Sequence, residues 1–262
     1  MAEYKTPGVY VEEISTLPPS VAGVATAVPA FIGYTEKASR NGKSLNNSPT
    51  HVTSMLDFHQ MFGGQASPGN ITVNLNEDNS VKDVSSQYNY YLYNSVKLYF
   101  ANGGGECYIV SVGLYGDEIN IDALNAGLGA VEKEDHPTIL LSPDAMLLEK
   151  KDQAYSFQQA MLAQCNNLQD RVAVLDVFDG HVDRADRDVV LDFRNGIGIN
   201  FLKYGAAYYP WIHSTYTTNF GFEDVTILSS DNEEINLEDL VSDPSSIVNL
   251  NAAIEDLKLV EA

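Results

Sequence analysis

Asp179, His181, Asp183 and Asp186 lie within eight residues and are the side chains of this chain best placed for chemistry. They follow an apolar segment that reads as a strand, and ligands bind at the carboxyl ends of strands in open α/β sheets. Carboxylates and an imidazole at such a place can hold a divalent cation, as in a metal-dependent α/β enzyme. The alternative, which we favour, is a polar turn leading into a helix over residues 183–195, with Asp183 as its N-cap.

A run of three glycines, Gly103 to Gly105, raises the question of a nucleotide site. A phosphate-binding loop runs from strand to glycines to helix, so that the helix N-terminus faces the phosphate. Here a helical pattern over residues 88–101 precedes the glycines and an apolar strand follows them. The partial negative charge of a helix C-terminus repels phosphate. We therefore predict a C-cap and a turn, and we reject the same reading for Gly196 and Gly198, which also follow a helix.

Other reactive groups give no further site. The two cysteines, Cys107 and Cys165, have apolar neighbours and read as buried small hydrophobic residues. The histidines lack the spacing of a metal pair on one helix, and the sequence holds no Gly-x-Ser-x-Gly nucleophile elbow. We therefore predict no catalytic residues, no bound metal and no cofactor, and a protein that is not an enzyme.

Apolar strands alternate with amphipathic helices along most of the chain. Such strands are too apolar for one face of their sheet to be exposed to solvent. This indicates a mainly parallel sheet with helices on both sides. The predicted fold class is α/β, a mainly parallel, mixed sheet flanked by helices. The strands are expected at residues 28–34, 52–54, 106–112, 138–141, 172–178, 204–212 and 224–228, and the helices at 56–62, 88–101, 121–132, 152–168, 183–195 and 247–260.

The first twenty residues read as an extended arm in front of this body. Val9, Tyr10, Val11, Glu12 and Ile14 form a short strand of strong β-formers, with a proline before it. A stiff, proline-containing linker, residues 15–20, follows the strand. A lone strand is unstable by itself and must dock on the rest of the chain or on another molecule. The sequence therefore divides into an arm, residues 1–20, and an α/β domain, residues 21–262.

The net charge and the lack of long apolar runs exclude some classes of partner. With 36 acidic and 15 basic residues the net charge is −21, so phosphate backbones and anionic membrane surfaces repel the chain. The N-terminus has no apolar signal segment, and no apolar run reaches the ~20 residues of a membrane span. We expect a protein that is made in the cytoplasm and neither binds nucleic acid nor inserts into a membrane.

The N-terminal sequence resembles the start of contractile tail sheath proteins. The resemblance rests on residues 4–14 and 18–33. Residues 58–64, 100–112 and 206–211 also fit the pattern of that family, so that the likeness spans nearly the whole chain. The family serves contractile phages, R-type bacteriocins and extracellular contractile injection systems.

The resemblance implies a structural subunit that polymerises around a rigid inner tube and drives it by contraction. Terminal arms of one subunit add strands to a sheet in its neighbours, which requires free backbone groups on a tethered strand. The implied partners are neighbouring sheath subunits, the inner tube protein and baseplate components of a phage tail or tail-like particle. Another phage structural protein, from a baseplate or a capsid, is the alternative within this class.

Two further expectations come with the resemblance. Pro18, Pro19 and Gly23 are the candidate hinge that lets the arm stay attached while the body rotates. Residues 21–262 resemble the outer domain of the family, whose inner, tube-facing domain is expected to be absent from this sequence.

Overall fold

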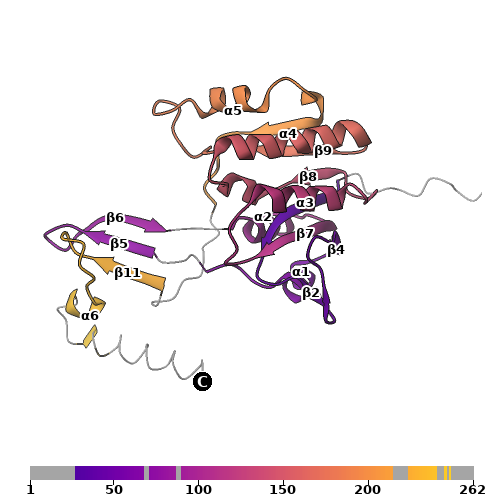
Figure 1. The fold of residues 1–262 in the computed structure, drawn as a ribbon. Coiled ribbons are helices and arrows are strands. Elements are labelled where there is room, and N and C mark those ends of the chain that lie inside the picture. The colour runs from indigo at the N-terminus through magenta and orange to yellow at the C-terminus, as the bar shows by residue number, and fades with distance from the viewer. Residues whose placement is uncertain are drawn as a thin grey trace, which may run out of the picture.

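The computed structural model describes residues 27–67, 71–86, 90–214, 224–240, 245, 246 and 248. Six strands form the central sheet in the order β10-β9-β8-β1-β7-β4. Each pair is parallel except β4 with β7, which is antiparallel. The predicted fold class, a mainly parallel mixed sheet flanked by helices, is confirmed (Figure 1).

Most elements of the central sheet and its helices lie close to the predicted ranges. The strands are β1 Pro29–Thr35, β4 Thr50–Val52, β7 Cys107–Leu114, β8 Ile139–Leu141, β9 Val172–Asp176 and β10 Gly205–Tyr208. The helices are α1 Met55–Phe62, α2 Leu92–Ala101, α3 Ile121–Val131, α4 Lys151–Leu168 and α5 Val189–Ile197, with short 3₁₀ turns η1 Pro143–Leu147 and η2 Leu202–Tyr204. None of the described helices is long and apolar enough to cross a membrane.

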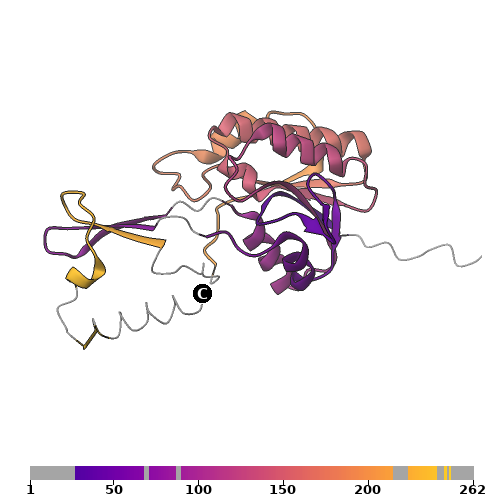
Figure 2. The same cartoon turned by 60° about the horizontal axis from the view of Figure 1, so that its bottom comes forward.

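Two core clusters lie on opposite faces of the central sheet. Figure 2 shows helices on both sides of the sheet. On one face, α3 and α4 cover inward residues such as Ile32, Leu140 and Leu175. On the other face, α1 and α2 bury Phe31 and Ile109 under a cluster that includes Phe58, Phe62 and Val96. The sheet is therefore doubly covered where β4, β7 and β1 lie.

The second face is covered over only half of its width. Among the described residues, α1 and α2 pack over β4, β7 and β1, and of the hydrophobic residues of β8, β9 and β10 only Leu141 packs against their cluster. Side chains alternate along a strand, so every second residue of these three strands points to the uncovered side. We call this surface the open face: Ile139, Leu141, Val172, Val174, Asp176, Ala206 and Tyr208.

A small second sheet stands away from the central one (Figures 1 and 2). It contains β5 Ile71–Leu75, β6 Val81–Ser86 and β11 Val225–Leu228, in the order β11-β5-β6. The sequence predicts a loop or hairpin for residues 65–87, and the structure has the hairpin. A two-stranded antiparallel hairpin of β2 Ser39–Arg40 and β3 Lys43–Ser44 lies between β1 and β4 in the chain. A short helix, α6 Leu237–Leu240, follows β11.

Two predicted helices begin later than expected. The helix predicted over residues 88–101 starts at Leu92, because the buried Asp144 carboxylate accepts the N–H groups of Tyr91 and Leu92 at that point. The prediction that Asp183 caps a helix over residues 183–195 is wrong. The Asp183 carbonyl closes an isolated turn, and Asp188 caps α5 by accepting the Leu191 N–H.

Candidate functional site

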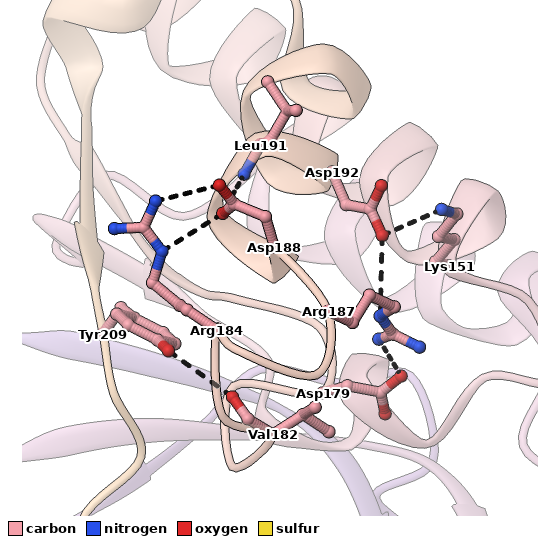
Figure 3. A network of polar contacts seen from close by, with 9 residues as sticks. All are labelled: Lys151, Asp179, Val182, Arg184, Arg187, Asp188, Leu191, Asp192 and Tyr209. Carbon is pink, nitrogen blue, oxygen red and sulfur yellow. Dashed lines mark hydrogen bonds and ion pairs between the residues drawn. The ribbon is translucent and has the colours of Figure 1, made fainter.

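The segment between β9 and α5 contains the four residues that the sequence singles out, and Figure 3 shows its ion pairs, which include Asp179. Arg184 donates two hydrogen bonds to the Asp188 carboxylate, from Nε at 3.2 Å and from Nη2 at 2.9 Å. Asp188 in turn accepts the Leu191 N–H at 3.1 Å. These bonds lower the pKa of Asp188, first through the Arg184 contact. The Asp188 carboxylate therefore pairs with the Arg184 guanidinium and caps the N-terminus of α5.

A second set of ion pairs fixes the other side of the same loop. Arg187 pairs with Asp179 through Nη2 and lies 3.7 Å from Asp192, which also receives the Lys151 ammonium at 3.0 Å (Figure 3). Asp179 adopts a left-handed backbone, with φ of 54°. The contacts tie the loop to the start of α4 and to the first turn of α5. All these side chains are partly or largely exposed, so each pair adds little stability.

His181 does not join the carboxylates. Its ring packs against Trp211, with 5.3 Å between the ring centres. Trp211 donates its indole N–H to the Val177 carbonyl at 3.0 Å, and its backbone N–H to the Gly180 carbonyl at 3.0 Å. A side chain at Gly180 would collide with the Trp211 ring. The histidine is therefore part of a packed turn.

The cation-site hypothesis finds no support in this geometry. Within the described ranges no group of three His, Cys, Asp or Glu side chains is placed to hold a metal ion. Asp179 and Asp188 face arginines, and Asp183 accepts the Ala185 N–H at 2.9 Å. The polar-turn interpretation accounts for every one of these contacts.

The other candidate chemical groups are structural as well. Gly103 has φ of 85° directly after α2, and the Gly104 N–H bonds to the Tyr99 carbonyl, so the glycines form the predicted turn at a helix C-terminus. Both cysteines are buried as predicted. Burial raises the pKa of Cys107 to about 12 and that of Cys165 to about 11, which keeps both thiols protonated and unreactive.

Sequence reasoning missed the most constrained carboxylate of the described chain, Asp144. Its side chain is fully buried and accepts three backbone N–H groups, from Tyr34 at 2.7 Å, Tyr91 at 2.5 Å and Leu92 at 3.0 Å. Asp144 thereby joins the end of β1 to the start of α2 across the sheet. Burial outweighs these bonds and raises its pKa to about 6. An aspartate directly after a strand and a proline was the only available signal.

The predicted arm residues, Val9, Tyr10, Val11, Glu12 and Ile14, lie outside the described residues. The hinge candidates Pro18, Pro19 and Gly23 lie outside them too. Their roles therefore remain predictions.

Strand addition requires an edge strand with free backbone groups, and both the central sheet and the small sheet have edge strands. In the described chain β10 pairs only with β9, and Ala206, Ala207 and Tyr208 are exposed along it. In the small sheet β6 pairs only with β5, and Val81 and Val84 are each 59% exposed. Such edges carry unpaired backbone groups and can accept a further strand.

The solved structures that this chain resembles include structures of the anti-feeding prophage. Its baseplate in the contracted state matches with a TM-score of 0.51 and 19% identity, over 79% of this chain and 48% of that chain. Its helical sheath in the contracted state matches with a TM-score of 0.46 and 22% identity, over 79% and 45%. Its six-fold symmetrised baseplate matches with a TM-score of 0.43 and 22% identity, over 79% and 46%.

The chain spans slightly less than half the length of the chains it matches. No protein-family model and no curated protein matches the sequence. At 19% identity a structural match concerns the fold. The sheet and helices described above therefore form a fold similar to that of a chain in the contracted baseplate of the anti-feeding prophage.

Proposed function

We propose that this chain is a structural subunit of a contractile tail sheath, which polymerises around an inner tube and drives that tube by contraction. The observation that carries the proposal is the fold match, over 79% of the chain, to a component of a contractile particle, the anti-feeding prophage baseplate in its contracted state. The resemblance of residues 4–14 and 18–33 to the start of sheath proteins points to the same class.

The proposed mechanism assigns the arm to subunit linkage. Val9 to Ile14 would pair through their backbone with a sheet edge of a neighbouring subunit, as in other β-augmented assemblies. Backbone pairing tolerates many side chains, so the link can persist while the bodies rotate. Pro18, Pro19 and Gly23 would absorb that rotation as the hinge.

The proposed partners are further copies of the chain, an inner tube protein and baseplate components. Assembly would take place in the cytoplasm, and the product would be part of a phage tail or tail-like particle. The net charge of −21 favours basic protein surfaces over nucleic acid among possible partners. The ion-pair network of the β9–α5 loop serves structure in this scheme, and no catalytic step is assigned to it.

A baseplate component is the second candidate. The match with a TM-score above 0.5 comes from a baseplate structure, whereas the sheath match has the lower value of 0.46. Electron microscopy of the purified protein separates the two functions. Long tubes of uniform diameter support the sheath, and closed rings that do not stack support the baseplate.

Removal of residues 1–17 tests the role of the arm. We expect the truncated protein to lose polymerisation in negative-stain images while its circular dichroism and thermal unfolding stay those of the complete chain. Tubes that form without the arm, or a truncated body that unfolds, would show that the segment is not an intermolecular strand.

A matched pair of substitutions sharpens this test. Val11→Pro removes one backbone N–H from the strand, whereas Val11→Ala keeps it and shortens only the side chain. Polymerisation should fail with proline and persist with alanine. Equal loss in both variants would mean that side-chain packing, and not backbone pairing, holds the arm.

A further inference from the structure

Among the residues that the structure describes, the open face lacks the full helical cover that a parallel sheet normally has. Sheets of this type are buried on both faces, yet here Val172 is 43% exposed and Tyr208 is 65% exposed. On the same face, Ile139, Leu141 and Val174 are only partly buried. A contiguous apolar surface of this kind marks a place where another molecule binds.

Two cavities turn the open face into a groove beside α2. One has a volume of about 760 Å³ and reaches Tyr208, Trp211 and Ile212; the other, of about 700 Å³, reaches Phe31, Leu141 and the glycine turn after α2. Both are lined by Ser95 and Leu98 of α2. Together they form one groove along the helix, from the Trp211 end to the glycine turn.

Asp176 is the one carboxylate among the described residues that line this groove. It stands at the end of β9, beside Tyr208 on β10, and no described residue donates a hydrogen bond or an ion pair to its carboxylate. Burial raises its pKa. Asp144 offers a contrast, because three N–H groups satisfy that carboxylate. A partly desolvated carboxylate without a donor among the described residues favours an occupant that supplies positive charge.

The walls near Asp176 also suit a planar cation. Tyr91, Tyr208, Tyr209 and Trp211 line the same cavity, and the Tyr91 and Trp211 rings meet edge to face with 5.9 Å between their centres. A guanidinium group stacks on aromatic rings and pairs with carboxylates, and it does both better than an ammonium group. The apolar groove continues well beyond this end, and a free small cation would leave most of it empty.

We propose that this groove is a docking site for an apolar segment of a neighbouring polypeptide that places an arginine against Asp176. The apolar residues of the segment cover Ile139, Leu141 and Val174, and its guanidinium group lies among the aromatic rings. The inference stands independently of the proposed function, because it requires only a partner chain with this chemistry.

Trp211 provides a direct readout, since it is the only tryptophan of the chain and lines the groove. The probe is a capped peptide of leucine and alanine with one central arginine, titrated into the complete protein while tryptophan emission is recorded. Its control is the same peptide with citrulline, which keeps the shape of arginine and loses the charge. We expect saturable binding of the arginine peptide and at least fivefold weaker binding of the citrulline peptide.

Two variants test the role of the carboxylate. Asp176→Asn should bind both peptides equally, while Asp186→Asn, which removes an exposed carboxylate outside the groove, should keep the fivefold preference. Thermal unfolding of Asp176→Asn should be unchanged or shifted upwards, because an unpaired carboxylate is removed. Equal binding of the two peptides to the wild type, or a preference that survives in Asp176→Asn, would overturn the proposal. N-butylguanidinium that binds as tightly as the peptide would also overturn it, in favour of a small-molecule site.

Discussion

Two halves of one sheet face behave differently in this molecule. Where β4, β7 and β1 lie, α1 and α2 bury Phe31 and Ile109 in an aromatic cluster. Where β8, β9 and β10 lie, equally apolar side chains such as Ile139 and Val174 stay partly exposed. The covered half contributes to folding within one chain, whereas the open half keeps its apolar area for a contact with another chain. The same strand pattern thus serves two purposes.

The largest effect is expected from a comparison of two isoleucines on the same sheet face, Ile109 in the covered half and Ile139 in the open half. Ile109 on β7 is fully buried under α1 and α2, so Ile109→Ala should cost about 2–5 kcal/mol in the free energy of unfolding. Ile139 on β8 lies on the open face, and Ile139→Ala should cost less than about 1.5 kcal/mol. Urea unfolding of the two variants measures both values, and similar losses would show that the described chain already buries both halves alike.

Asp144 sets the position of α2 and therefore the boundary between the covered and the open half. The next largest effect expected is the change in folding stability as Asp144 titrates. Burial raises its pKa in the folded protein to about 6, from an ordinary value of 3.8. A raised folded-state pKa contributes stability that is complete below the unfolded pKa and is lost as the pH rises through the folded pKa.

The wild type should accordingly lose about 2–3 kcal/mol of stability between pH 4 and pH 7 relative to Asp144→Asn, in which position 144 does not titrate. Chemical unfolding of both proteins across this range measures the difference. Parallel pH profiles would contradict the assignment, because the exposed carboxylates are common to both proteins and cancel in the comparison.

The smallest effect is expected in the β9–α5 loop beside the open face. Arg184 and Arg187 hold exposed carboxylates, and exposed ion pairs add little to stability. Arg184→Ala and Arg187→Ala should leave the thermal midpoint and the Trp211 emission unchanged. A shift of that emission would mean that the loop controls the aromatic end of the groove, and the two sites would then have to be treated as one.

Several elements could be predicted from local pattern because their cause is local. The apolar strand before the glycine turn, the turn itself and the helix over residues 121–132 each follow from adjacent residue types, and the structure confirms them. The start of α5 could not be predicted, because Asp183 and Asp188 are equally good capping residues in the sequence. The pairing of Arg184 with Asp188 accompanies the later start, and such a contact exists only once the loop is folded.

The sequence by itself determined the alternation of strands and helices, the parallel character of the sheet and the order of helix, glycines and strand that excludes a phosphate loop. These follow from the period of apolar residues and from the chemistry of glycine and proline, which act over a few positions. Only the tertiary structure decided which half of the sheet face is covered by described helices, that the Asp144 carboxylate accepts three N–H groups and that the Asp176 carboxylate accepts none from the described residues. Those outcomes depend on the strand order and on residues more than fifty positions apart, such as Asp144 and Tyr91, and no local pattern encodes which distant groups will meet.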